Sequence, residues 1–359
     1  MADTGDAGAG MRRFRPEGGG GSGGSKLKAV RDFGSNPGGL AMKVYAPPGL
    51  KPGAPLVVVL HGCTQLAGGY EASAGWTALA DEHRFAVLYP EQRRVNNPKL
   101  CFSWFAPHRA ARDKGEAASI RQMIETMTAR WRLDRSQVFV TGLSAGGAMA
   151  AVMLASYPEV FAGGAIVAGL PFGAADGVSA AFAAMSQGRD LDARSWGDLV
   201  RAASPHEGPW PRVTIWQGAD DRTVARANAD GLFAQWADVH GLDADRARET
   251  QVGRLTWKTL GDAVELNIVA GMDHGVPIDA ARGERAAPYM LDVGLSQARA
   301  TLAFWGLERQ AHRQAIRSAP SRARPAEPRQ APPSPPPAPV AATVEAVITK
   351  ALRAAGLMK

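Results

Sequence analysis

The fold of this chain is decided by the stretch Val138-Phe139-Val140-Thr141-Gly142-Leu143-Ser144-Ala145-Gly146-Gly147-Ala148-Met149. Its first four residues are β-branched or aromatic and favour a strand, while the alanine-rich run after Ser144 favours a helix. Between them lies Gly-x-Ser-x-Gly, so the stretch predicts a strand, a tight turn and a helix. That arrangement is a nucleophile elbow, in which the turn presents a serine hydroxyl clear of the sheet.

The same pattern occurs a second time, at Gly20-Gly21-Ser22-Gly23-Gly24. That copy has no strand-forming run before it and no helix-forming run after it, so it is typical of a flexible linker. Context therefore favours Ser144 over Ser22 as a nucleophile. The non-catalytic alternative is that Ser144 is only a small residue in a strand-to-helix turn.

Strands and helices are expected to alternate on both sides of the elbow. An alternating run at 40–47 indicates an edge strand. Continuous apolar runs, each expected of a strand buried on both faces, occur at 55–60, 85–89, 161–170, 213–216 and 264–269. Helices are predicted at 68–83, 116–131, 228–240 and 296–305, the last with Ser296 as its N-cap. This order predicts an α/β fold with a mainly parallel sheet and helices on both faces.

The composition divides the chain into four segments. Residues 1–25 are glycine-rich and are expected to be disordered, whereas 26–308 carry the α/β domain. Within that domain, 171–210 break the alternation and predict a helical lid insertion over the carboxyl edge of the sheet. Residues 309–340 form a Pro- and Arg-rich linker, and 341–359 a short amphipathic helix.

Composition also limits the function classes. A hydrophobic share of 45% and a charged share of 21% are ordinary for a globular protein. The net charge of +7 owes much to arginines after residue 308, and without interleaved aromatics it does not indicate nucleic-acid binding. No stretch approaches the ~18 apolar residues of a membrane span. No zinc- or calcium-type ligand spacing is present, so no metal or other cofactor is expected.

Two features bear on the compartment. The N-terminus has no apolar core after its charges, so it is not predicted to be a secretory signal. Either the protein stays in the cytoplasm or its export segment is missing from this sequence. Cys63 and Cys101 are the only cysteines. They permit one disulfide, in an oxidising compartment, or two buried thiols, and the count alone favours thiols.

A serine nucleophile needs a base, and the base needs an orienting acid. In elbow-containing folds these follow the serine in the order acid, then histidine. His206 falls in the predicted lid and His240 at a helix end, whereas His274 directly follows the strand at 264–269 and is the favoured base. Asp220 and Asp221 both follow the strand at 213–216, and either aspartate could be the acid; both could instead be helix caps.

The oxyanion of the transition state also needs hydrogen-bond donors. One expected donor is the backbone N–H of Ala145, directly after the nucleophile. The other should come from the loop after the strand at 55–60, which reads His61-Gly62-Cys63-Thr64-Gln65. The Cys63 N–H is the natural candidate there, and Gln65 lies near enough in sequence to touch the substrate.

Five motifs together resemble the poly(3-hydroxybutyrate) depolymerase-family esterases, which are α/β-hydrolases related to feruloyl and acetylxylan esterases. They are the segments at 61–65 and 141–149 quoted above, with Tyr89-Pro90-Glu91-Gln92, Cys101-Phe102-Ser103-Trp104-Phe105 and Gly271-Met272-Asp273-His274-Gly275. The resemblance covers about Leu40 to Leu307.

The resemblance implies Ser144 as nucleophile, His274 as base and, by the family's Gly-x-x-Asp-x-x-Val pattern, Asp221 rather than Asp220 as acid. It also implies a Cys63–Cys101 disulfide, contact of Trp104 and Phe105 with the substrate, and an extracellular location.

The predicted function is that of a serine carboxylic-ester hydrolase acting through an acyl-enzyme on short-chain hydroxyalkanoate esters, as polymer or oligomer. The alternatives are a feruloyl- or acetylxylan-type esterase, and a catalytically silent relative that binds a polymer or partner through its tail.

Overall fold

The computed structural model of the protein describes residues 25–308. The predicted N-terminal segment (apart from Ser25), the linker at 309–340 and the helix at 341–359 lie outside the described residues. No helix within 25–308 is long and apolar enough to cross a membrane.

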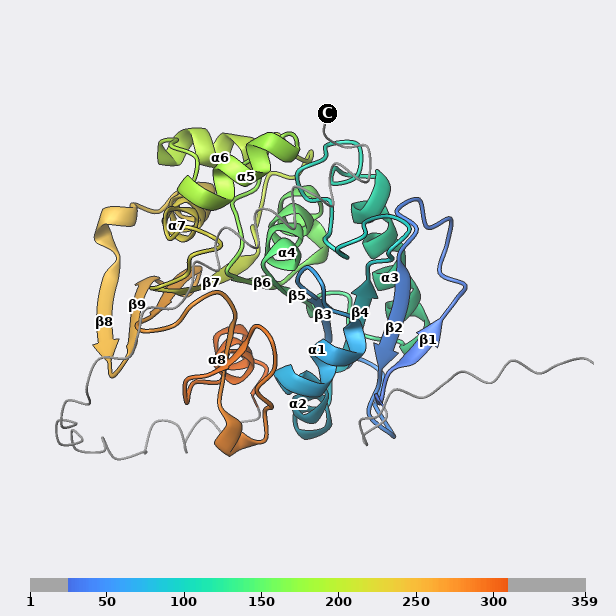
Figure 1. Cartoon of the computed structure of the whole chain (residues 1–359). Helices are drawn as coiled ribbons and strands as arrows, with labels where there is room; N and C mark the ends of the chain where they lie inside the picture. Colours follow the sequence, from blue (N-terminus) through green and yellow to red (C-terminus); the bar gives the residue numbers. More distant parts are fainter. Residues whose placement is uncertain (1–24, 309–359) are drawn as a thin grey trace, which may run out of the picture.

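One sheet of ten strands organises the described chain (Figure 1). Its order is β1 (Lys28–Val30), β2 (Ala41–Tyr45), β4 (Ala86–Glu91), β3 (Leu56–Leu60), β5 (Val138–Leu143), β6 (Gly163–Val167), β7 (Arg212–Gly218), β10 (Val264–Val269), β9 (Leu255–Leu260) and β8 (Arg248–Val252). The six strands from β4 to β10 in this order pair in parallel, and antiparallel strands lie at both ends. The predicted mainly parallel sheet is confirmed.

Side chains of the central strands alternate between two hydrophobic cores. In β3, Leu56, Val58 and Leu60 enter the core shared with α3 (Gly115–Trp131), α4 (Ala145–Ser156) and α7 (Ala227–Val239). The intervening Val57 and Val59 enter the core shared with α1 (Ala67–Ala74), α2 (Trp76–His83) and α8 (Gln297–Trp305). Figure 1 shows these two groups of helices on opposite faces of the sheet. A strand covered on both faces has to be apolar throughout, which is why these strands read as continuous apolar runs.

Several local predictions need correction. The helix expected at 68–83 is two helices, because Gly75 adopts φ 73° and ends α1. Two short strands after the one at 264–269, β11 (Val276–Ile278) and β12 (Met290–Asp292), were not predicted. The hairpin β8–β9 was not predicted, because its side chains are mostly exposed or half-buried and lack an apolar run.

The insertion predicted at 171–210 contains α5 (Val178–Gln187) and α6 (Ala193–Arg201), and α6 packs closely on α7. Between this insertion and the segment after Cys101 lies a pocket of about 570 Å³. Its walls include Trp104, Phe105, Phe172, Ala174, Ala184 and Leu199. Two of the residues expected to touch substrate therefore line an apolar hollow beside the helical insertion.

Candidate active site

Ser144 occupies a strained turn between β5 and α4. Its backbone has φ 57° and ψ −119°, a region that residues other than glycine rarely adopt. A Cβ on Gly142 would collide with the carbonyl of Gly146, and a Cβ on Gly146 would collide with the carbonyl of Leu60. Only glycine therefore lets β3, β5 and α4 approach so closely, which is the geometry predicted for an elbow.

The structure joins Asp221 to His274. Asp221 Oδ2 lies 2.8 Å from His274 Nδ1, and its side chain is fully buried. The same oxygen accepts a hydrogen bond from Gln217 Nε2, while Oδ1 accepts from the backbone N–H groups of Thr223 and Val224. These bonds hold the carboxylate in one orientation, so that Nδ1 of His274 donates to it and Nε2 is left without this partner.

The competing residues lie elsewhere. The Asp220 side chain is exposed and makes none of these bonds. His206 Nε2 pairs with the carbonyl of Pro209, and His240 Nε2 with that of Pro211. Among the residues that the sequence left open, His274 and Asp221 form the pair.

Ser144, Asp221 and His274 meet at one edge of the sheet. Backbone hydrogen bonds continue the strand order outward there, from Ser144 N–H to Val167, from Ala168 N–H to Trp216, and from Ala219 N–H to Val269. Each triad candidate follows the carboxyl end of its strand, where ligand sites form in such sheets. Within residues 25–308 the Ser144 hydroxyl makes no hydrogen bond, and what relates Ser144 to the Asp221–His274 pair is this shared edge of the sheet.

The predicted oxyanion loop, His61–Gln65, lies against the elbow. The Gly62 N–H donates to Gln65 Oε1 at 2.8 Å, and Gln65 Nε2 reaches the carbonyl of Pro288, next to Tyr289. The Tyr289 ring in turn contacts the His274 ring edge-on. Among the described residues, the Cys63 N–H has no hydrogen-bond acceptor. Gln65 therefore links the two sides of the site.

His61 is buried and both of its ring nitrogens are used. Nε2 lies 3.0 Å from the backbone N–H of Gln92 and must accept, so Nδ1 carries the proton and donates to the Gly62 carbonyl at 2.8 Å. Burial lowers the pKa of His61 to about 4, which keeps the ring neutral. The Gly62 carbonyl and the Cys63 N–H belong to one planar peptide group, so fixing the first also aims the second.

The disulfide between Cys63 and Cys101 is present, which corrects the preference for free thiols from the cysteine count. It ties the oxyanion loop to the segment that carries Trp104 and Phe105, whose rings meet edge-on at 5.5 Å. A second link is the bond from the Thr64 N–H to the Lys99 carbonyl.

Sequence reasoning gave no role to Gln92 or Glu116, which are both buried behind these loops. Gln92 Nε2 donates to Glu116 Oε1 and to the Cys101 carbonyl. The only available signal was the place of Gln92 in the motif at 89–92, and Glu116 had none beyond its position at the start of a helix.

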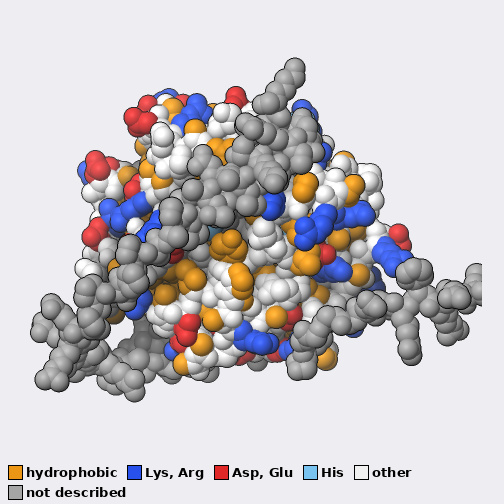
Figure 2. Space-filling view, viewed as in Figure 1, with side chains coloured by type: hydrophobic (Ala, Val, Ile, Leu, Met, Phe, Trp, Pro, Cys, Tyr) orange, Lys and Arg blue, Asp and Glu red, His pale blue; other side chains and the backbone are white. Residues whose placement is uncertain are grey.

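Exposed apolar side chains lie next to residues of the site. Leu66, next to Gln65, is 51% exposed and Tyr289 is 41% exposed. Figure 2 shows hydrophobic side chains reaching the surface in the middle of one face, with Lys and Arg side chains to either side. Residues 25–308 contain no group of three or more His, Cys, Asp or Glu side chains arranged as metal ligands.

The fold and this site define an α/β-hydrolase. Among solved structures, an acetyl xylan esterase from Aspergillus awamori superposes with a TM-score of 0.69 at 25% identity, covering 79% of this chain and 99% of that chain. The chain therefore shares its overall fold with an esterase of known structure.

The sequence relatives narrow the class to a family. The family model described as "Esterase PHB depolymerase" matches residues 40–256. Poly(3-hydroxyalkanoate) depolymerase C of Paucimonas lemoignei is 44% identical over 291 residues, 78% of this chain and 70% of that protein. Acetylxylan esterase A of Aspergillus oryzae is 32% identical over 265 residues, 70% of this chain and 85% of that protein. The chain belongs to the PHB depolymerase family of esterases and is a carboxylic ester hydrolase.

Proposed function

We propose that Ser144, His274 and Asp221 form the catalytic triad of this esterase. The observation that carries the proposal is the 2.8 Å bond between His274 Nδ1 and the buried Asp221 carboxylate, at the sheet edge where the elbow presents Ser144. A buried carboxylate that is held by four donors fixes both the tautomer and the direction of the imidazole.

The reaction follows from this arrangement. His274 Nε2 takes the Ser144 hydroxyl proton, Oγ attacks the ester carbonyl, and Asp221 stabilises the imidazolium that forms. The imidazolium then protonates the leaving alcohol, which leaves the acyl group on Ser144. Water, deprotonated by His274, releases the acid and restores the serine.

The developing oxyanion is placed against the N–H groups of Cys63 and Ala145. The Ala145 N–H belongs to the first turn of α4, where backbone N–H groups lack partners within the helix. The Cys63 N–H lacks an acceptor within the described chain and is aimed by the His61–Gly62 bond. Two preset donors of this kind stabilise the tetrahedral intermediate more than the ground-state carbonyl.

The substrate class we infer is short-chain hydroxyalkanoate esters, as polymer or oligomer. The support is the 44% identity with a poly(3-hydroxyalkanoate) depolymerase, together with the apolar pocket that Trp104 and Phe105 line. Exposed Leu66 and Tyr289 offer apolar contacts at the mouth of the site for an extended polyester chain.

A second candidate is an acetylxylan-type esterase, favoured by the superposition on such an enzyme over 99% of its chain. The third alternative, a silent relative, is disfavoured because the Asp221–His274 pair and the strained Ser144 are intact. For the compartment, the Cys63–Cys101 disulfide supports an oxidising one, such as the extracellular space.

The test is a hydrolysis screen of the full chain and its Ser144→Ala variant. The substrates are 3-hydroxybutyrate oligomers, p-nitrophenyl butyrate, a feruloyl ester and acetylated xylan. We expect the highest kcat/KM on the hydroxybutyrate oligomers, and no turnover by the variant. Preference for acetylated xylan would assign the second candidate instead, and turnover by the variant would contradict the triad.

A further inference from the structure

Glu116 is a buried carboxylate that lies behind the site. It is the second residue of α3, and its side chain is fully buried. Burial raises the pKa of Glu116, although hydrogen bonds from Ser103 and Gln92 lower it. Burying a carboxylate costs free energy unless hydrogen-bond donors surround it. Hydrogen bonds to a charged carboxylate are strong, so the donors of Glu116 are held firmly in place.

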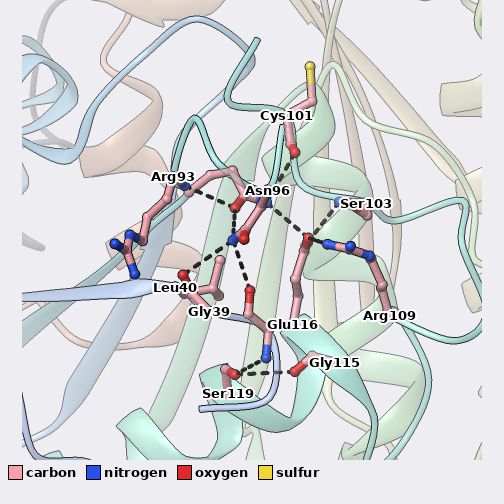
Figure 3. Close-up of polar contacts among 12 residues, drawn as sticks. Gly39, Leu40, Arg93, Asn96, Cys101, Ser103, Arg109, Gly115, Glu116 and Ser119 are labelled. Atoms are coloured by element: carbon pink, nitrogen blue, oxygen red, sulfur yellow. Dashed lines mark hydrogen bonds and ion pairs between the residues drawn. The ribbon is translucent and has the colours of Figure 1, made fainter. Parts of the chain in front are cut away.

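The two carboxylate oxygens bind two different loop segments. Oε2 accepts the backbone N–H of Ser103 at 2.7 Å, and Oε1 accepts Gln92 Nε2 at 2.9 Å. Arg109 Nη1 lies 3.9 Å from Oε1. Figure 3 shows the carboxylate pointing from α3 toward the segment that runs from Asn96 to Ser103.

The Ser103 contact leads to the substrate wall, because Ser103 immediately precedes Trp104 and Phe105. A backbone N–H bonded to a carboxylate on a helix fixes where the next residues lie. The wall of the pocket is thereby anchored to α3 and not only to the disulfide.

The Gln92 contact leads to the oxyanion loop. Gln92 Oε1 accepts from Asn96 Nδ2, which also donates to the Gly38 carbonyl, so the amide cannot rotate freely. The Gln92 backbone N–H then donates to His61 Nε2, and His61 Nδ1 donates to the Gly62 carbonyl. The last peptide in this series is the one that carries the Cys63 N–H.

The geometry points to Glu116 as a positioning residue that sets both the oxyanion loop and the Trp104–Phe105 wall of this esterase. This inference rests on the proposed function, because it assumes that the Cys63 N–H receives the oxyanion. Glu116 itself touches neither substrate nor triad, and acts only through Gln92 and Ser103.

The variant that tests this is Glu116→Gln. Glutamine has the same shape but only one acceptor oxygen, so its NH₂ group has to face either Gln92 Nε2 or the Ser103 N–H, and one bond is lost. Removing an oxyanion donor costs about 10²–10³ in kcat, and misaiming one should cost about 10- to 100-fold. Loss of the Ser103 bond should instead raise KM through the displaced wall.

The assay is p-nitrophenyl butyrate hydrolysis by the full chain, with kcat expressed per active site counted by titration with a p-nitrophenyl phosphonate. A purely structural role would reduce the number of titratable sites but leave kcat and KM per site unchanged. The control is Glu265→Gln, a carboxyl at the amino end of β10. Thr214 and Asn267 both donate to Glu265 Oε1, and glutamine keeps that one acceptor oxygen, so this variant should change kcat and KM by less than about twofold.

A change in kcat or KM per site for Glu116→Gln, but not for Glu265→Gln, supports the inference. Unchanged constants per site would overturn it. If Glu116→Gln yields no folded protein, Asn96→Ala takes its place, since it frees the Gln92 amide. A few-fold fall in kcat per site is then expected, and no fall overturns the inference. Turnover by Ser144→Ala would instead contradict the proposed function, independently of Glu116.

Discussion

The site has two sides that hold a histidine in opposite ways. On the triad side, at the ends of β5, β7 and β10, His274 is bonded through Nδ1 to Asp221, and Nε2 has no such partner. On the oxyanion side, at the ends of β3 and β4, His61 uses both ring nitrogens, one as donor to the Gly62 carbonyl and one as acceptor from the Gln92 N–H. Both rings are more than nine-tenths buried, so burial alone does not separate them.

The two histidines differ in whether one ring nitrogen remains available for protonation and deprotonation. A base must change its protonation state during the reaction, whereas a ring that must accept from a backbone N–H cannot be protonated without losing that bond. His274 is therefore suited to proton transfer and His61 to holding a peptide group.

The largest effect is expected from Ser144→Ala. Loss of the nucleophile in a comparable serine enzyme lowers kcat by about 10⁶-fold. We expect a loss of that order on p-nitrophenyl butyrate, with the thermal unfolding midpoint changed little because only one hydroxyl is removed. Ser22→Ala, at the second Gly-x-Ser-x-Gly, is the control and should retain full activity. Substantial activity in Ser144→Ala would remove the triad side from the mechanism.

The next largest effect is expected from Asp221→Asn. An amide at this position favours the wrong tautomer of His274, and the same substitution in a serine protease lowers kcat by about 10⁴-fold. Asp220→Asn is the matched control, because Asp220 is the neighbouring, exposed carboxylate. We expect it to change kcat by less than about twofold, as surface substitutions usually do little. Similar losses in the two variants would leave the acid unassigned.

The triad side could be predicted from the sequence because each residue directly follows a strand, and the strands read as apolar runs. The pattern alone did not choose between Asp220 and Asp221. Family resemblance favoured Asp221, and of these two aspartates it is Asp221 whose carboxylate bonds to the His274 ring.

The oxyanion side could be predicted only in part. The loop His61–Gln65 follows a strand and carries a motif, but Gln92 and Glu116 bind backbone groups whose positions no spacing reveals. Two features of the fold were also missed. The residues on both sides of Gly75 favour a helix, so the sequence predicted one helix where there are two. The strands of the hairpin β8–β9 are exposed or half-buried and carry no continuous apolar run.

We expect the disulfide on the oxyanion side to stabilise the folded protein and to have little effect on kcat. Cys63 and Cys101 are 38 residues apart, and closing a loop of that size stabilises the folded state by about 4 kcal/mol in the chain-entropy model. We expect the Cys63→Ser, Cys101→Ser double variant to lose about that much in chemical denaturation, measured under oxidising conditions.

The same double variant should keep most of its kcat at temperatures where it is folded, because the Gln92 and Glu116 bonds still hold the loops. Wild type in reductant should match it, which serves as the control. A kcat loss as large as that of Asp221→Asn would mean that the disulfide, and not the polar network, sets the Cys63 N–H.

The smallest effect concerns the pH dependence of stability. Burial lowers the pKa of His61 from 6.5 to about 4. Between those values the unfolded chain binds a proton that the folded protein does not, so the free energy of unfolding falls as the pH drops from about 6.5 to 4, and falls no further below it. Since one pKa unit corresponds to about 1.4 kcal/mol, His61 should account for a loss of about 3 kcal/mol across this window.

The variant that isolates this loss is His61→Asn, because asparagine can donate to the Gly62 carbonyl but does not titrate. Burial raises the pKa values of Glu116, Glu265 and Glu284, which favours the folded state as the pH falls and so opposes the His61 effect. Those groups are present in both proteins and cancel in the difference. Urea unfolding at pH 7 and pH 4 should therefore show a difference between wild type and variant that shrinks by about 3 kcal/mol at the lower pH. A constant difference would mean that His61 takes up a proton in the folded protein with the same pKa as in the unfolded chain, so that His61 would not be held neutral as a peptide-binding ring.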